Sequence, residues 1–499
     1  MKLLQNTLFK RNPFMRSIVA SKAYYGSSDV RSWKDIPGPT SVPVLGQLYH
    51  FLPGGSLYEL MGYPLQKELY NRYGNIVRVD SMLGRPSMVH LYDAEAAAQI
   101  LRGENSIPIR HPVRSVEYYR RVYRKEKNMK IHKFSGLFND QGEVWKEFRS
   151  ATDPILMHPK SVQSFQPIVD DVAQDMIKRL RHFRDDNNMI RKKITNEINL
   201  WSMESIAAIA LGDRINCLDP NLPEDSPVNK LIENIAGFFE VSYLLDFQLN
   251  LWPYNQKKVL KRAMQIYENI DELCQYFINK AMLKLQRNEL RYSSALEKLI
   301  EYDETTALIM VADMLFGGAD TSSNALLFIL YLLAKNPDKQ QKLRVEVISN
   351  SGSKVYMRAC IKEAMRILPA APENSRVTTR EYDVLGYRIP KDMTIMLGHQ
   401  LMCTMENYYP KANQYIPERW IVNKDNPLYQ DRANSFAYSP FGFGVRMCIG
   451  RRIVEAEIEA LLTRLMENFH IGWDGPSPNI KHTFVNAMVE PLYFTFKDV

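Results

Sequence analysis

Phe441-Gly-Phe-Gly-Val-Arg-Met-Cys-Ile-Gly450 is the stretch that decides the fold of this chain. Its glycines allow tight turns and close approach to a flat ligand. Apolar periodicity predicts a helix over 448–468, which would begin at Cys448. Because a helix N-terminus carries positive potential, it favours a thiolate over a thiol, and Arg446 adds charge nearby. Such a soft anionic sulfur can ligate haem iron. A buried, inert cysteine is the commoner role, so the loop on its own leaves both readings open.

The ten residues together resemble the haem-binding loop of cytochromes P450, Phe-x-x-Gly-x-Arg-x-Cys-x-Gly. The matching residues are Phe441, Gly444, Arg446, Cys448 and Gly450. Chance agreement at all of these fixed positions is improbable. The resemblance implies haem b with Cys448 as the axial ligand of its iron. It also implies the P450 fold, which is mainly α with small β-sheets and holds the haem between two long helices.

The composition is that of an ordinary globular protein. The chain has 499 residues, 45 % of them hydrophobic and 24 % charged, with a formal net charge of +8. No basic run with interleaved aromatic residues and no zinc-finger spacing occurs, so we expect no nucleic-acid partner. Five widely spaced cysteines without a Cys-x-x-Cys pair argue against a disulfide scaffold and structural zinc, and indicate a reducing compartment.

The N-terminus differs from the rest of the chain. No acidic residue precedes Asp29, while lysines and arginines alternate there with apolar residues and serines. This composition predicts a mitochondrial transit peptide over 1–34, followed by a single haem-thiolate monooxygenase domain over 35–499. A disordered basic tail is the alternative. The longest apolar run, Ala325–Ala334, is too short to span a bilayer.

Hydrophobic periodicity places most of the helix in the middle of the chain and β-structure towards both ends. This order differs from the regular alternation of a parallel α/β sheet. The expected helices are 163–184, 193–211, 256–290, 305–335 and 355–368, and the expected strands lie in 76–82, 87–91, 376–400 and the last 20 residues.

The expected helix 305–335 contains Phe316-Gly-Gly-Ala-Asp-Thr-Ser322. Glycines are costly inside a helix, and their use here would be to let the helix bend and a ligand approach. A kink with a back-bonded threonine is the alternative. By resemblance this is the oxygen-binding groove, where Thr321 contacts the oxygen and Asp320 helps to deliver protons.

Glu363-Ala-Met-Arg366 matches the Glu-x-x-Arg pair of the family, and Pro417-Glu-Arg-Trp420 supplies Arg419. On a helix, residues three apart share a face, and such pairs are commonly surface ion pairs. The resemblance implies instead that Glu363, Arg366 and Arg419 form a buried structural triad behind the haem.

A Trp-x-x-x-Arg pattern occurs at Trp145 and Arg149. An indole N–H and a guanidinium can both bind a carboxylate. The resemblance implies that Trp145, Arg149, Arg376 and Arg446 bind the haem propionates.

Basic residues suggest the electron donor. Arg358 and Lys362 lie four apart on the helix of Glu363, and Arg451 and Arg452 follow the cysteine loop. Solvated surface charge is the alternative. These positions match those by which mitochondrial P450s dock an acidic two-iron ferredoxin, which implies electrons from NADPH through ferredoxin reductase and ferredoxin. Overall the chain resembles insect members of the mitochondrial group. The inner membrane, on its matrix side, is the expected location.

The resemblance implies a monooxygenase that uses O2 and a lipophilic substrate, steroid-like or xenobiotic. The pocket would draw on 108–135, 236–252, 312–321, 370–376 and 484–489, where Phe238, Phe239, Ala370, Ala371, Val485 and Met488 are apolar. Segment 236–252 could instead contact a membrane surface peripherally. The segment 344–361 is shorter than is usual in the family, which leaves a non-catalytic haem-binding protein or an impaired variant as the alternative function.

Overall fold

The computed structural model describes residues 30–42, 46–82, 86–190, 192–247, 257–349, 351–429, 433–483 and 485–499. The predicted leader therefore lies outside the described residues except for its last five positions. The last five residues of segment 236–252 lie outside them as well.

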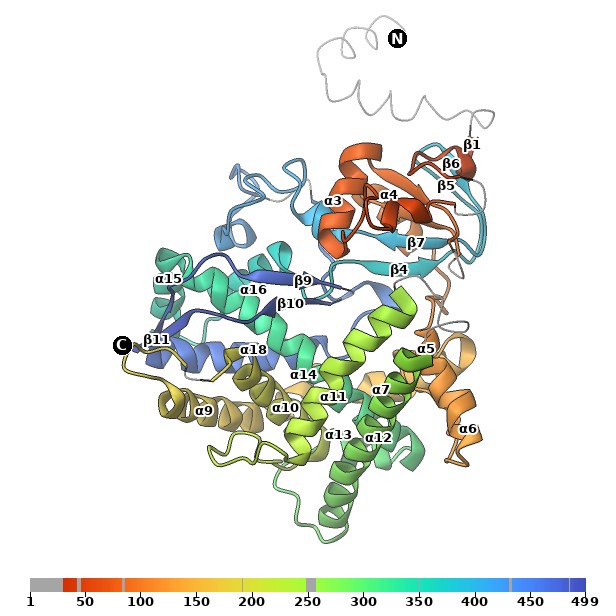
Figure 1. The fold of residues 1–499 in the computed structure, drawn as a ribbon. Coiled ribbons are helices and arrows are strands. Elements are labelled where there is room, and N and C mark those ends of the chain that lie inside the picture. Colours follow the sequence, from red (N-terminus) through yellow and green to blue (C-terminus); the bar gives the residue numbers. More distant parts are fainter. Residues whose placement is uncertain are drawn as a thin grey trace, which may run out of the picture.

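Helices form most of the molecule, and the short strands lie partly at one end of it and partly across the helical part (Figure 1). The expected helices are present with boundaries shifted by a few residues. The principal helices are α7 (Gly142–Leu156), α9 (Gln166–Phe183), α10 (Ile194–Leu211), α11 (Pro227–Ser242), α12 (Lys257–Gln286), α14 (Glu304–Ala334), α15 (Pro337–Ile348), α16 (Val355–Ile367) and α18 (Arg451–Asn468).

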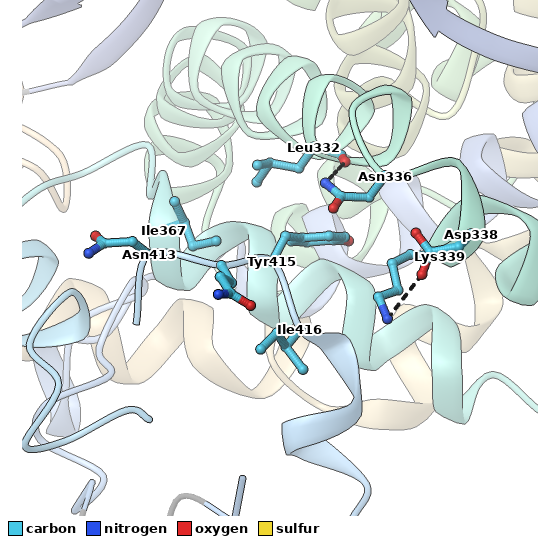
Figure 2. A pocket seen from close by; sticks show the side chains of 9 residues that line it. Leu332, Asn336, Asp338, Lys339, Ile367, Asn413, Tyr415 and Ile416 are labelled. Atoms are coloured by element: carbon cyan, nitrogen blue, oxygen red, sulfur yellow. Dashed lines mark hydrogen bonds and ion pairs between the residues drawn. The ribbon is translucent and has the colours of Figure 1, made fainter. Parts of the chain in front are cut away.

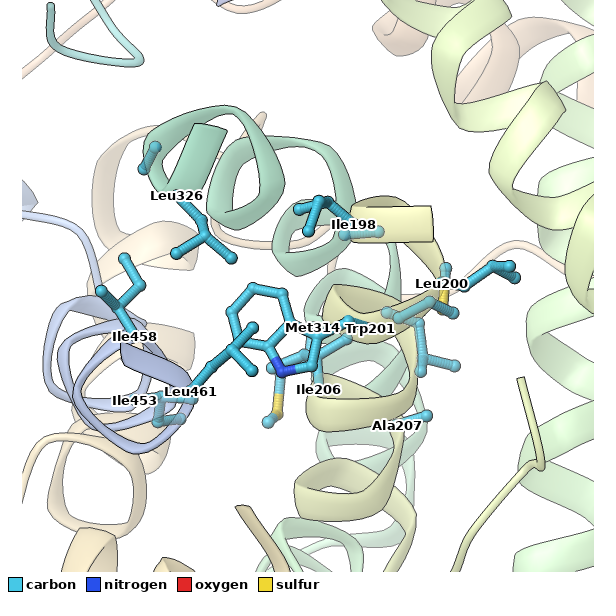
Figure 3. Close-up of a cluster of buried hydrophobic side chains, with 14 of the residues drawn as sticks. Ile198, Leu200, Trp201, Ile206, Ala207, Met314, Leu326, Ile453, Ile458 and Leu461 are labelled. Atoms are coloured by element: carbon cyan, nitrogen blue, oxygen red, sulfur yellow. The ribbon is translucent and has the colours of Figure 1, made fainter. Parts of the chain in front are cut away.

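The long helix α14 passes through the core. Asp303 begins it, because its side chain accepts a hydrogen bond from the Thr306 N–H. Its C-terminal half is buried on nearly every side, as its continuous apolar sequence requires. Trp201 of α10 is fully buried, and Figure 3 shows it among side chains of α14 and α18. The two helices expected to flank the cofactor, α14 and α18, are thus parts of one hydrophobic core.

In the part of the chain that the structure describes, four small sheets complete the fold and confirm the expected class, mainly α with small β-sheets. The largest has the order β2-β3-β7-β4, from β2 (Ile76–Val79), β3 (Met88–Leu91), β7 (Thr394–Leu397) and β4 (Asn374–Val377). In it β3 and β7 are parallel, and the other pairs are antiparallel. A second sheet joins β1 (Arg31–Ser32), β6 (Tyr387–Ile389) and β5 (Tyr382–Val384). Two hairpins pair β8 (Phe469–Trp473) with β11 (Phe494–Asp498), and β9 (Asn479–His482) with β10 (Asn486–Val489).

The connection between α15 and α16, which is expected from the sequence to be short for the family, is held by one side chain. The Glu346 carboxylate accepts hydrogen bonds from the N–H groups of Tyr356 (2.9 Å) and Met357 (2.8 Å) and from the Ser353 hydroxyl (3.1 Å). A carboxylate at this place satisfies the first free donors of α16. The short segment therefore closes with a capped helix.

Among the described residues, no helix combines the length and the apolar character needed to cross a membrane.

Candidate active site

The Cys448 loop has the geometry of an anion cradle. The Cys448 N–H donates to the Phe441 carbonyl (2.8 Å), and Gly442 and Gly444 have φ values of +75° and +68°. Such values favour glycine. The prediction that the helix begins at Cys448 is wrong, because α18 begins at Arg451. Before the helix begins, the N–H groups of Gly450 and Arg451 lie close enough to the Cys448 thiol to lower its pKa.

Opposing effects act on the Cys448 thiol. Burial raises its pKa, while the N–H groups of Gly450 and Arg451 and the charges of Arg149 and Arg110 lower it. The side chain is nevertheless accessible to solvent, although protein atoms surround it closely enough to raise its pKa. The other four cysteines are buried and none forms a disulfide. Cys448 is thus the one cysteine that is both accessible and placed to act as a metal ligand.

The predicted propionate ligands lie together. Arg149 of α7, Arg376 of β4 and Arg446 are buried, and the Arg446 guanidinium lies 3.7 Å from the centroid of the Trp145 ring. Sequence reasoning missed Arg110, which belongs to the same group. Burial and the neighbouring guanidinium groups lower the pKa of Arg110 to about 10 and that of Arg446 to about 8. No motif marks Arg110, so only the structure could reveal it.

This cluster has too few counter-charges. Arg376 forms an ion pair with Glu104, and Arg149 pairs with Asp153 at 2.6 Å. Within the described ranges, Arg110 and Arg446 form no ion pair and donate instead to main-chain oxygens, for example to the Phe138 and Pro108 carbonyls at 3.2 and 3.0 Å. Buried cations of this kind require an anionic partner.

The residues around Cys448 therefore fit haem b. The sulfur supplies a soft anionic ligand for iron, and the unbalanced guanidinium groups suit the two propionates.

The oxygen-groove residues lie on α14. The Thr321 hydroxyl donates to the Gly317 carbonyl at 2.8 Å, which is the back-bonding that the sequence had left as an alternative. A Cβ at Gly317 would meet nothing within 4 Å, so this side of the helix has room for a ligand. The explanation offered for Gly318 was wrong. A Cβ at Gly318 would lie 2.6 Å from the Ile206 side chain, and the Ser202 hydroxyl donates to the Gly318 carbonyl at 3.0 Å. Gly318 therefore allows α10 to pack closely against α14 and does not make room for a ligand.

Two carboxyl groups lie near this turn. Burial raises the pKa of Asp320 to about 6. Sequence reasoning missed Glu457 of α18, whose pKa burial raises to about 8 against the effect of a hydrogen bond from Ser322. A carboxylate among the apolar positions of 448–468 was the available signal. Both groups have pKa values suited to exchanging protons near neutral pH.

Glu363, Arg366 and Arg419 meet in the interior, and each side chain is 0 % exposed. Arg366 donates to both Glu363 oxygens at 2.9 Å, and Arg419 donates to one of them at 2.9 Å. Trp420 and the Ile416 N–H add bonds of 2.9 and 3.0 Å. The structure thus joins α16 to the segment around Pro417–Trp420 through a single carboxylate.

The four predicted docking cations differ in their surroundings. Arg358 pairs with Glu459 at 2.7 Å and Arg451 with Glu455 at 3.1 Å. Lys362 and Arg452 are exposed and form no ion pair in the part of the chain that the structure describes. The free positive charge of this surface therefore comes from Lys362 and Arg452.

Apolar side chains expected in the pocket contact α14. The Phe316 ring lies 4.5 Å from that of Phe238 and 6.0 Å from that of Phe239. On another side, the Asn486 N–H donates to the Ala370 carbonyl at 2.7 Å and brings β10, with the buried Met488, to the 370–376 segment.

A separate cavity of about 480 Å³ lies where α14 ends and α15 begins (Figure 2). Leu332, Lys339 and Tyr415 are among its lining residues. None of the predicted catalytic or cofactor-binding residues lines it. We therefore assign it no part in the chemistry.

Comparison with known proteins agrees with this site. A sequence model of the family described as Cytochrome P450 matches residues 36–495. The chain therefore belongs to the cytochrome P450 family, whose members are typically monooxygenase oxidoreductases. It is 32 % identical to Probable cytochrome P450 12b2, mitochondrial, of Drosophila melanogaster, over 90 % of this chain and 86 % of that protein. It is also 32 % identical to Cytochrome P450 CYP12A2 of Musca domestica, over 94 % and 92 % respectively.

Proposed function

We propose that this P450 inserts one oxygen atom of O2 into a lipophilic substrate in mitochondria, with electrons from NADPH through ferredoxin reductase and a two-iron ferredoxin. The observation that carries the proposal is the Cys448 cradle, in which two N–H groups point at an accessible sulfur beside a surplus of buried arginines. Haem, when bound, supplies the redox chemistry and the activation of O2.

The chain's own residues then have distinct tasks. Arg110, Arg149, Arg376 and Arg446 would hold the propionates and orient the cofactor. Thr321 and Asp320 would hold and deliver protons on the substrate side of α14. Asp320 suits this task because burial brings its pKa to about 6, close enough to neutrality for it to gain and lose a proton readily.

The proposed donor rests on charge. Lys362 on α16 and Arg452 on α18 offer exposed, unpaired cations to an acidic protein, and complementary charge accelerates encounter. Relatives from Drosophila melanogaster and Drosophila acanthoptera carry the word mitochondrial in their names. Both observations support a mitochondrial, ferredoxin-dependent enzyme on the matrix face of the inner membrane.

Peripheral membrane contact through 236–252 belongs to the same proposal. In its described part Leu245 is fully buried, whereas Tyr243 and Leu244 are partly exposed. Contact with lipid would therefore fall to these two residues and to residues beyond 247. Fractionation of the full chain with liposomes, with and without the 248–252 apolar residues changed to serine, tests this point.

Reconstitution of the purified chain with ferredoxin, its reductase and a panel of sterols and xenobiotics tests the function. We expect oxygenated product that depends on NADPH and on ferredoxin. The reduced carbon monoxide complex should show the long-wavelength band of a thiolate ligand, and Cys448→Ser should abolish it. Cys360→Ala, at a buried cysteine outside the site, should retain it. A thiolate band without product from any substrate would favour the non-catalytic haem-binding alternative.

A further inference from the structure

A small cavity of about 40 Å³ lies between α14, α12, α11 and the π-helical segment η3 (Tyr119–Tyr123). Arg120, Asp271 and Asp313 contribute charged groups to its wall. Phe138, Phe238 and Phe316 contribute rings. Apolar walls with a few placed polar groups are typical of ligand sites.

The Asp313 carboxylate is fixed in this wall. Its Oδ2 accepts a hydrogen bond from the Leu137 N–H at 2.8 Å. Gly136 has a φ of +85°, and a Cβ there would lie 2.3 Å from Oδ2 and 2.5 Å from Oδ1, so only glycine lets the loop come this close to the carboxylate. Among the described residues, Oδ2 has the Leu137 N–H as its donor and Oδ1 accepts no hydrogen bond.

Arg120 is the nearest cation to that second oxygen. Its Nη2 lies 3.8 Å from Asp313 Oδ1, which is too long for a hydrogen bond. Neighbouring charges are already engaged, since Arg124 bonds to Asp271 and Arg121 pairs with Asp140 at 3.6 Å. No hydrogen bond joins the Arg120 guanidinium to another described residue. A donor and an acceptor thus face each other across a gap.

The chemistry of the gap selects one kind of group. A hydroxyl can accept from Arg120 and donate to Asp313 at the same time. Arg120 and Asp313 together carry no net charge, so an ammonium or a carboxylate would gain from one partner what it loses to the other. It would still lose its hydration in this largely apolar cavity, a cost that a neutral hydroxyl avoids. A cavity of about 40 Å³ accommodates a group the size of one hydroxyl or one water molecule.

The spacing of Asp313 and Asp320 along α14 gives the distance between this cavity and the predicted oxygen groove. Asp313 precedes Asp320 by seven residues, so the two lie on one face, separated by about 10 Å at 1.5 Å per residue. Phe316 lies between them, and its ring contacts those of Phe238 and Phe239. Along this face of α14 the Arg120–Asp313 pair comes first, the Phe316 ring follows, and the predicted oxygen groove at Asp320 comes last.

We propose that Arg120 and Asp313 bind a hydroxyl group of the substrate, so that this P450 prefers lipophiles with one hydroxyl about 10 Å from the oxidised carbon. This inference rests on the proposed function and names the substrate class of that site. Arg120 and Asp313 determine specificity, because they contact the substrate and none of the reacting atoms.

The test compares matched ligands by substrate-induced spectral titration of the haem-loaded full chain. The probes are a 3-hydroxysterol with its 3-deoxy analogue, and dodecanol with dodecane. We expect the wild type to bind the alcohol of at least one pair about tenfold to a hundredfold more tightly, as hydrogen bonds to charged groups allow. Asp313→Leu and Arg120→Met should bring that ratio close to one, and Asp313→Asn, which still accepts a hydrogen bond, should retain part of it.

Cys274→Ala is the matched control, because Cys274 also lines the cavity but offers no strong donor. It should change the affinity for both members of a pair alike. Equal affinity of the wild type for the alcohol and its partner in both pairs would overturn the inference. A preference for the alcohol that survives both Asp313→Leu and Arg120→Met would also overturn it, because the two side chains would then bind only a structural water. A haem-loaded wild type without the thiolate band would instead overturn the proposed function. The two failures are therefore distinguishable.

Discussion

Replacement of Glu363 by glutamine should remove a large part of the stability of the fold without preventing the chain from folding. The carboxylate accepts five hydrogen bonds, from Arg366 (two), Arg419, Trp420 and the Ile416 N–H. Glutamine has one acceptor oxygen and an NH2 group in place of the other. Whichever oxygen is replaced, at least two of these donors then face a donor.

The magnitude follows from burial. Glu363, Arg366 and Arg419 are each 0 % exposed, so the variant leaves buried guanidinium charge without its counter-ion. Breaking a buried pair in this way costs about 3–5 kcal/mol. Since a folded domain is stable by only about 5–15 kcal/mol, we expect a marginal protein with a much lower unfolding midpoint.

Urea unfolding followed by circular dichroism measures the change, with haem content recorded in parallel. Glu68→Gln is the control, because Glu68 pairs with Arg72 at 2.5 Å at the surface, where the loss should stay below about 1 kcal/mol. A Glu363→Gln protein that lost less than about 1 kcal/mol would refute the view that this carboxylate holds the interior together.

Three further predictions concern protons and charge. Asp320→Asn should lower turnover and remove an apparent pKa near 6 from the pH–rate profile, and an unchanged profile would exclude Asp320 from proton delivery. Because the pKa of Glu457 is raised from 4.5 to about 8, the native chain holds a proton that the unfolded chain loses, and stability falls as the pH rises through this window. Glu457→Gln should reduce this loss in the free energy of unfolding between pH 5 and 8 by about 1 kcal/mol or more. The same pH dependence of unfolding in the variant and the native chain would contradict the prediction. Lys362→Gln combined with Arg452→Gln should slow reduction by ferredoxin about tenfold at low salt without altering the carbon monoxide band, whereas equal rates would place docking elsewhere.

The parts of the fold that the sequence predicted are those with local causes. The helices of the middle region follow from apolar periodicity, and α9, α10, α12, α14 and α16 begin and end within a few residues of expectation. The cysteine loop was predicted from its resemblance to the haem-binding loop of the family, in which particular residues occupy fixed positions.

The missed features depend on contacts between distant segments. Arg110 joins the propionate cluster only because the chain returns beside β4 and the cysteine loop, and nothing adjacent to it in the sequence marks this. Gly318 was assigned to the ligand because Ile206, which requires the space, lies on another helix. The start of α18 was misplaced because Cys448–Gly450 continues the apolar pattern while its N–H groups turn back towards the sulfur.

The Glu346 junction between α15 and α16 has a practical consequence for handling this protein. Three apolar side chains flank this junction and are 59–60 % exposed, namely Val345, Ile348 and Val355. Adjacent apolar side chains in water promote association between copies at high concentration. Since the capping bonds are made by Glu346 and Ser353, these three positions can be changed to polar residues without loss of the cap. The junction is accordingly the first place to modify for crystallisation.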